Sequence, residues 1–119
     1  MPPIKVTIIG AGSRFAFSVV SDLMRYEAFA GSTVALVDTN SDALDLSARI
    51  IEQMIKTANG DLHIEKSIDR RDLLADSDFV LNSISVGEPW ARERDVAIGE
   101  QHGIYQPTSQ TVGPAGFMR

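Results

Sequence analysis

The chain has 119 residues, of which 44% are hydrophobic and 23% are charged, and its formal net charge is −5. This composition predicts one globular domain over 1–119 that buries about two-thirds of its unfolded surface. No stretch reaches the ~20 apolar residues of a membrane-spanning helix, and no secretion signal precedes the first apolar run, so we expect a cytoplasmic protein without a membrane partner. The acidic balance argues against nucleic acid as a partner. The absence of cysteine excludes disulfides and thiolate chemistry within the chain.

The first predicted strand, 4–9, runs directly into Gly10-Ala11-Gly12-Ser13-Arg14-Phe15. Its nearly continuous apolar run favours a parallel strand buried on both faces. Two glycines spaced by one residue, between a strand and a helix, are typical of a loop that offers backbone N–H groups to the pyrophosphate of a dinucleotide. Phe15 stands where the generic fingerprint has a third glycine. Arg14 could neutralise the pyrophosphate, reach a 2′-phosphate or remain solvated.

The helix after this loop is predicted over 13–26, followed by a second strand over 33–37. Apolar side chains recur along that helix at helical spacing, namely Phe15, Val19, Leu23 and Tyr26, with Val20 and Met24 beside them. Asp38 ends the second strand, where a carboxylate can accept hydrogen bonds from both hydroxyls of an adenosine ribose. It would also repel a 2′-phosphate, which favours NAD over NADP. The alternative is that Asp38 caps the next helix.

A long helix is expected after Asp38. Asn40 or Ser41 can cap it, because a short polar side chain there accepts a hydrogen bond from the first free N–H groups, and Asn40 is also counted among the cofactor-binding candidates. Asn59-Gly60 ends the helix. Its predicted buried stripe consists of Leu44, Ala48, Ile51 and Ile55.

The second half of the chain continues the alternation of strands and helices. Residues 62–68 alternate as an edge strand would, a short charged helix is expected around 69–75, a fourth strand over 78–85 and a helix over 90–101. Residues 105–119 show no period and predict a loop that leads to the start of a helix. The alternation predicts an α/β fold, a Rossmann-like doubly wound parallel sheet with strand order 3-2-1-4 and right-handed crossovers.

In such a sheet, ligands bind at the carboxyl ends of the strands, in the crevice where the strand order reverses. Three loops are predicted to meet there: 10–15, the turn at Asp38, and the end of the fourth strand. Ser83, Ser85 and Val86 form that last loop, where the second ribose and the nicotinamide would lie. Position alone supports this assignment, since small polar residues are common in loops.

The loop sequence from Gly10 to Phe15 resembles the opening of glycoside hydrolase family 4, and Phe15 fits the pattern of that family. The family comprises NAD- and divalent-metal-dependent α-glucosidases, α-galactosidases and 6-phospho-glycosidases. Further similarities follow in order at Asp78-Phe79-Val80-Leu81, Ser85-Val86-Gly87, Arg92 with Asp95, Gly103-Ile104-x-Gln106, and 110–119. The resemblance covers essentially the whole chain.

For a whole protein the resemblance implies hydrolysis of O-glycosyl bonds by an unusual route, distinct from the two-carboxylate scheme. NAD transiently oxidises C3 of the sugar, a base removes the C2 proton, a metal, expected to be manganese, stabilises the enediolate, and the substituent at C1 is eliminated. The resemblance assigns the pyrophosphate to Gly10, Gly12, Ser13 and Phe15, the ribose to Asp38, the nicotinamide side to 83–87, and sugar contact to Arg92 and Asp95. No catalytic or metal-binding residue is expected within the chain, since the family's metal ligands and catalytic tyrosine lie further along.

Departures from the family pattern leave the preferred sugar open, and they occur at Glu88, His102, Gln110 and Ala115. We therefore expect the N-terminal NAD-binding domain of a family 4 glycosidase, which by itself binds NAD weakly and hydrolyses nothing. Two alternatives stay open: an NAD-dependent dehydrogenase domain of the lactate/malate type, and a non-enzymatic NAD-sensing module. A fourth strand with an uncovered outer edge further predicts self-association into a homo-oligomer.

Overall fold

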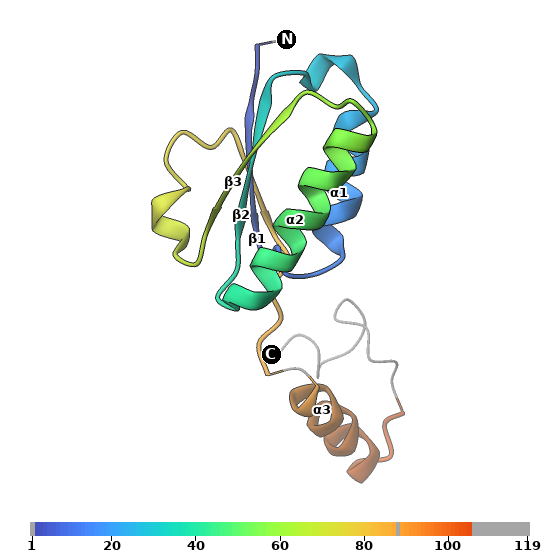
Figure 1. Ribbon diagram of the computed structural model, residues 1–119. Coiled ribbons are helices and arrows are strands. Elements are labelled where there is room, and N and C mark those ends of the chain that lie inside the picture. The colour runs from blue at the N-terminus through green and yellow to red at the C-terminus, as the bar shows by residue number, and fades with distance from the viewer. Residues whose placement is uncertain (1, 88, 106–119) are drawn as a thin grey trace. The chain divides into compact units, whose positions relative to one another are not determined.

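A computed structural model of the chain describes residues 2–87 and 89–105 (Figure 1). The chain divides between residues 84 and 85 into two compact units, so the single domain expected over 1–119 stays a prediction. Glu88 and the family-like residues 106–119, Gln106, Gln110 and Ala115 among them, lie outside the described residues.

The first unit is built on a sheet of four parallel strands with the order β3-β2-β1-β4. The strands are β1 (Lys5–Ile9), β2 (Ser32–Val37), β3 (Leu62–Ser67) and β4 (Phe79–Asn82). The predicted fold class and strand order are confirmed. At the carboxyl end of the sheet, Ile9 lies beside Val37 of β2 and beside Asn82 of β4, so three strands end next to one another.

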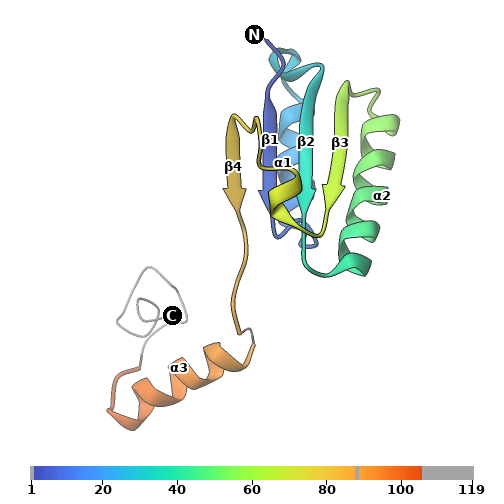
Figure 2. The same cartoon turned by 90° about the vertical axis from the view of Figure 1, so that its left-hand side faces the viewer.

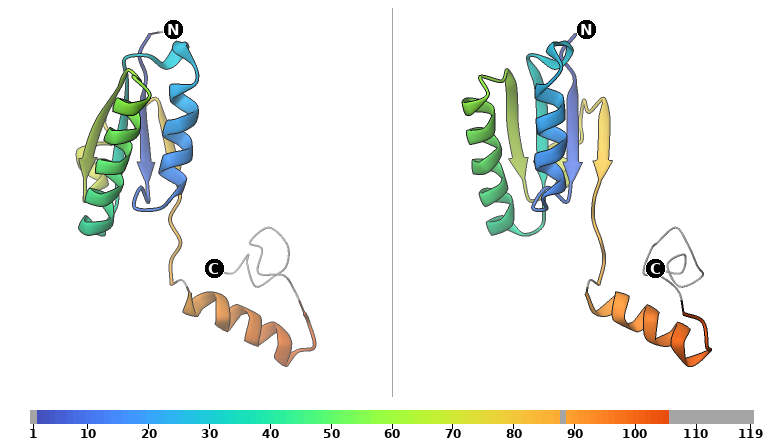
Figure 3. Two further views of the ribbon diagram at one scale, coloured as in Figure 1. Left: turned by 45° about the vertical axis from the view of Figure 1, so that its right-hand side comes forward. Right: turned by 90° about the vertical axis from the view of Figure 1, so that its right-hand side faces the viewer.

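Two helices, α1 (Phe15–Met24) and α2 (Ser41–Thr57), cover one face of this sheet, as Figure 3 shows. Two short 3₁₀ helices, η1 (Glu27–Phe29) and η2 (Arg70–Asp72), lie in connections. The segment that carries η2 lies against the opposite face (Figure 2). The short helix predicted around 69–75 is present only as the three-residue 3₁₀ helix η2.

The core lies between the sheet and the two helices. The predicted stripe of α2 is confirmed, since Leu44, Ala48 and Ile51 are buried and Ile55 packs against them. In α1 the buried residues are Ala16 and Val20, and Val19 and Leu23 of the predicted pattern are partly buried and pack against the core. The predicted pattern is therefore confirmed for Val19 and Leu23 and wrong for Phe15 and Tyr26, which are exposed.

The helix α1 is shorter than the predicted 13–26 and β4 is shorter than the predicted 78–85. At the C-terminal end of α1, the Tyr26 amide donates to the Leu23 carbonyl three residues back (3.3 Å), and Tyr26 has extended backbone angles. The Ser83 amide still donates to the Ile9 carbonyl (2.8 Å), so β4 ends one residue before its last sheet hydrogen bond.

On the opposite face of the sheet, the connection from β3 to β4 is held by a pair of hydroxyl groups. The Thr7 Oγ1 atom lies 2.6 Å from the Ser77 Oγ atom, and Thr7 is fully buried. Asp78 then joins the start of β1 twice: its carboxylate accepts from the Lys5 amide (2.8 Å) and its amide donates to the Lys5 carbonyl (2.9 Å). These contacts fix where β4 enters the sheet.

The second unit contains α3 (Trp90–Gln101), which confirms the helix predicted over 90–101. No residue of α3 is buried within the described part of the chain. Its C-terminal end is closed by Gly103, which has a φ of 70°, and by the Ile104 amide, which donates to the Gly99 carbonyl (2.9 Å). Among the described residues, no helix combines the length and the apolar character needed to cross a membrane.

Candidate functional site

The loop that follows β1 is fixed first by its backbone. The amides of Gly10 and Ala11 both donate to the Val37 carbonyl, at 2.8 and 3.0 Å, so the loop starts against the end of β2. Gly10 has a φ of 91°, and a Cβ atom there would lie 2.6 Å from the Ser83 carbonyl oxygen. Glycine is needed at this position both for the turn and for the close approach of the end of β4.

The second glycine of the loop faces β2 and α2. The Gly12 amide donates to Asp38 Oδ2 at 2.8 Å, and a Cβ atom on Gly12 would lie 2.7 Å from that oxygen and 2.9 Å from the Ala43 Cβ atom. The sequence explains this glycine by the approach of a pyrophosphate. The structure adds a reason that sequence reasoning missed: the side chain that ends β2 already occupies the space beside Gly12.

Asp38 holds a second backbone amide with its other oxygen. Asp38 Oδ1 accepts from the Asn40 amide at 2.9 Å, while the Asn40 side chain accepts from the Ala43 amide at 3.1 Å. Asn40 is therefore the N-cap residue of α2, which confirms Asn40 over Ser41. The alternative that Asp38 caps this helix is wrong. Asp38 instead bridges the glycine loop and the turn into α2.

The start of α1 is the open side of the loop. The Ser13 hydroxyl donates to the Gly10 carbonyl at 3.0 Å, and Arg14 occupies the N-cap position without a side-chain hydrogen bond to the helix. Arg14 and Phe15 are exposed, and the first turn of α1 contains no acidic residue. Because the first N–H groups of a helix lack acceptors within it and carry partial positive charge, an anion is stabilised at such an end.

Within the first unit, residues from each of the three predicted loops lie in contact. Gly10 meets Ser83 and Gly12 meets Asp38, so the glycine loop lies between the ends of β4 and β2. Ser85 and Val86 belong to the second unit, where Val86 is 76% exposed.

Arg92 and Asp95 lie in α3 of the second unit, three residues apart and thus on one side of that helix. Both take part in interactions within the described structure. Their predicted contact with a sugar stays a prediction.

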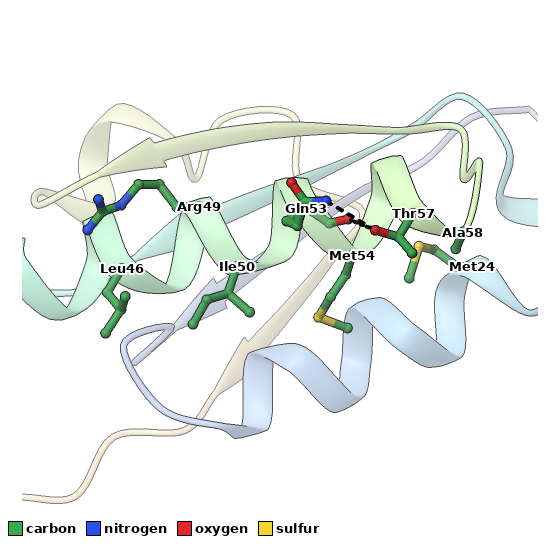
Figure 4. Close-up of a pocket in the computed structure, with 8 residues that line it drawn as sticks. All are labelled: Met24, Leu46, Arg49, Ile50, Gln53, Met54, Thr57 and Ala58. Carbon is green, nitrogen blue, oxygen red and sulfur yellow. Dashed lines mark hydrogen bonds between the residues drawn. The ribbon is translucent and has the colours of Figure 1, made fainter.

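A separate hollow of about 720 Å³ lies along α2 and the end of α1 (Figure 4). Leu46, Ile50 and Met54 form a row at a spacing of four residues, with Met24 of α1 nearby. Among the described residues that line it, Arg49 is the one that carries a charge. An apolar lining of this kind does not provide the clustered backbone donors that a pyrophosphate requires, so the candidate dinucleotide site is the start of α1 beside the glycine loop. In the described part of the chain, no group of three or more acidic or histidine side chains is placed to hold a metal ion.

A parallel 3-2-1-4 sheet, a glycine turn after the first strand and a carboxylate at the end of the second define a Rossmann-like α/β fold. The sequence profile described as family 4 glycosyl hydrolase matches residues 5–119. The chain belongs to this family, which confirms the resemblance seen in the sequence.

Individual relatives agree with this assignment. The chain is 37% identical over 117 residues to an α-galacturonidase from Bacillus subtilis, a match that covers 98% of the chain and 25% of the relative. The crystal structure of a putative glucosidase from the same organism has a TM-score of 0.81 at 32% identity, over 98% of the chain and 26% of the relative. A 6-phospho-α-glucosidase from gut microorganisms, solved in complex with NAD and Mn²⁺, shares the fold with a TM-score of 0.78 at 20% identity, over 98% and 26%. The chain thus spans about a quarter of the length of these relatives.

Proposed function

We propose that this chain forms the NAD-binding part of a glycosidase that hydrolyses O-glycosyl bonds. The observation that carries the proposal is the glycine loop, which is held between Asp38 and Ser83 while the start of α1 stays open and free of acidic residues. Membership of family 4 and the NAD found in a relative of the same fold support it.

In this proposal, different residues of the loops bind different parts of NAD. The open start of α1, with Ser13, Arg14 and Phe15, receives the pyrophosphate, because helix N-terminal amides favour an anion. Asp38 accepts the hydroxyls of the adenosine ribose: a carboxylate has about four lone-pair sites, and two of them are used by Gly12 and Asn40. Two lone-pair sites of Asp38 therefore remain for the ribose hydroxyls in this proposal.

The chemistry that NAD supplies when bound is the reversible removal of hydride from C3 of the sugar. This chain binds and orients the cofactor and the sugar in this proposal. Ser83, Ser85 and Val86 flank the nicotinamide, and Arg92 and Asp95 contact the sugar. A divalent metal, with manganese expected, belongs to the proposal for the whole protein, and no described residue of the chain is assigned to it.

Calorimetric titration of the chain with NAD, and in parallel with NADP, tests the cofactor assignment. We expect NAD to bind more tightly than NADP, and Asp38→Ala to abolish the difference because the 2′-phosphate is no longer repelled. Asp42→Ala, which removes an exposed carboxylate from the first turn of α2, is the matched control and should leave the preference intact. Equal affinity of the unaltered chain for both nucleotides would contradict the role of Asp38.

The glycosidase activity is tested on the full reading frame. We expect release of sugar that depends on NAD and on Mn²⁺. Family membership favours this activity over a dehydrogenase of the lactate/malate type, and a non-enzymatic sensor predicts that no glycoside is cleaved. Which glycoside is cleaved stays open, because the relatives described above act on different sugars.

The proposal includes self-association through β4. Among the described strands β4 pairs only with β1, and Phe79 and Val80 are 58% and 48% exposed, so this edge can pair with another strand. Sedimentation of the chain should show species larger than a monomer, and a stable monomer would contradict the prediction. A cytoplasmic location without nucleic acid or membrane partners also stays a prediction.

A further inference from the structure

Asp38 makes two contacts that have nothing to do with a ribose. Its Oδ2 atom accepts from the Gly12 amide at 2.8 Å and its Oδ1 atom accepts from the Asn40 amide at 2.9 Å. Hydrogen bonds from backbone amides to a carboxylate are charge-assisted and stronger than those between neutral groups. One side chain therefore joins the glycine loop after β1 to the turn that leads into α2.

The packing around Gly12 makes this connection specific. A Cβ atom on residue 12 would lie 2.7 Å from the Asp38 oxygen and 2.9 Å from the Ala43 Cβ atom, closer than such atoms approach in proteins. The loop backbone thus lies directly against the carboxylate and the first turn of α2. The Gly12 amide is thus hydrogen-bonded within the protein, to the Asp38 carboxylate.

We propose that Asp38 is a positioning residue, which holds the glycine loop in its cofactor-binding conformation before any nucleotide arrives. The inference rests on the proposed function and deepens it: the same carboxylate sets the shape of the pyrophosphate loop and receives the ribose. The diphosphate is then bound by a loop whose conformational entropy has been lost in folding and not in binding.

Amide hydrogen exchange in the ligand-free chain tests the positioning role without any cofactor. The Gly12 and Asn40 amides should exchange roughly tenfold faster in Asp38→Ala, which loses both acceptors. Asp38→Asn keeps one acceptor oxygen, so it should free one of the two amides and give an intermediate result. Asp42→Asn is the same chemical change in the first turn of α2 and should change neither amide. The amide of Ile8, in the buried centre of β1, should stay protected in every variant, which shows that the fold is retained.

A nucleotide without ribose hydroxyls separates loop positioning from direct contact. We expect Asp38→Ala to weaken binding of 2′,3′-dideoxyadenosine 5′-diphosphate by about tenfold, and binding of ADP by a larger factor. Removing a negative charge near a diphosphate would by itself strengthen binding, so weakened binding of the dideoxy compound points to the loop. Weaker binding of ADP with unchanged binding of the dideoxy compound would overturn the positioning role and leave only ribose contact.

The two proposals fail in different ways. If the unaltered chain binds neither nucleotide, its proposed cofactor role is contradicted, while exchange at Gly12 and Asn40 still decides what Asp38 does to the loop. If exchange at both amides is the same in Asp38→Ala as in the unaltered chain, the positioning role is wrong even when NAD binds.

Discussion

The helices α2 and α3 end in the same way. In α2, Asn59 has a φ of 50° and the Gly60 amide donates to the Ile55 carbonyl at 2.9 Å. In α3, Gly103 has a φ of 70° and the Ile104 amide donates to the Gly99 carbonyl, also at 2.9 Å. Each is a left-handed residue followed by a hydrogen bond that closes the last turn.

The two helices differ at their starts and along their sides. The Asn40 side chain caps α2, whereas no side-chain hydrogen bond caps α3 after Pro89. Four residues of α2 are buried, and none of α3 is buried within the described part of the chain. A closing motif determines where a helix stops, but an isolated helix of this length is marginal in water, and buried apolar contact stabilises it. The two helices should therefore respond very differently to the same substitution.

The largest effect is expected in the buried stripe of α2. Ile51 is fully buried in the core, and Ile51→Ala should lower the free energy of unfolding by about 2–5 kcal/mol, because it removes buried methyl groups and leaves a cavity. Urea denaturation followed by far-UV circular dichroism measures the loss. A change below about 0.5 kcal/mol would mean that α2 does not pack on the sheet as described.

The next effect concerns the side-chain N-cap, which α2 has and α3 lacks. Asn40→Ala removes the hydrogen bond to the Ala43 amide and should cost about 1 kcal/mol of unfolding free energy. Ser41→Ala changes the neighbouring exposed residue and serves as the matched control, with an expected change within about 0.5 kcal/mol. Equal losses for the two variants in urea denaturation would show that the cap contributes nothing.

The same change that damages α2 should be nearly neutral in α3. Ile98 is 48% exposed, so Ile98→Ala should change the unfolding free energy by no more than about 0.5 kcal/mol. The measurement is the same urea denaturation as for Ile51→Ala. A loss as large as that of Ile51→Ala would show that Ile98 is buried in solution, for instance by self-association, and sedimentation of the same sample would reveal that cause.

The smallest effect is expected for an exposed ion pair on the solvent side of α2. The Lys66 ammonium lies 2.6 Å from Asp45 Oδ1, and its hydrogen bond and positive charge hold the pKa of the Asp45 carboxyl below its ordinary value. The link that this pair makes between α2 and β3 is thus complete above the ordinary pKa of an aspartate, and it is lost as the pH falls through the lowered value. Lys66→Met should return the pKa of Asp45 toward the ordinary value in an NMR titration. An unchanged pKa would mean that the pair does not persist in solution.

The sequence is sufficient to predict the helices and strands whose apolar residues follow a strong pattern. The apolar run of β1 and the four-residue spacing of Leu44, Ala48 and Ile51 both reflect burial against the sheet, and alternation of strands and helices then limits the strand order to few choices. The pattern is less reliable for α1, where Val19 and Leu23 pack against the core but Phe15 and Tyr26 are exposed.

For the candidate site, the sequence identified the residues and not their contacts. It marked Gly12 and Asp38 separately, each for a different part of a nucleotide. Their hydrogen bond joins residues 26 positions apart, and it depends on the register of β1 against β2 and on the turn before α2. Neither is encoded in local spacing. The exposure of Phe15 follows from the rotation of α1 about its axis, which local spacing does not fix either.

The position of β4 next to β1 has a consequence for how the chain is made. The ribosome releases β1 first and β4 last of the four strands, so α2 and β3 are synthesised while one edge of β1 has no neighbour. Parallel pairing between such distant segments is slow, since a long loop must close before any contact is gained. The exposed edge of β1 is meanwhile a template on which a second nascent chain can pair. This exposure of the β1 edge thus lasts until Phe79–Asn82 leaves the exit tunnel and pairs with it.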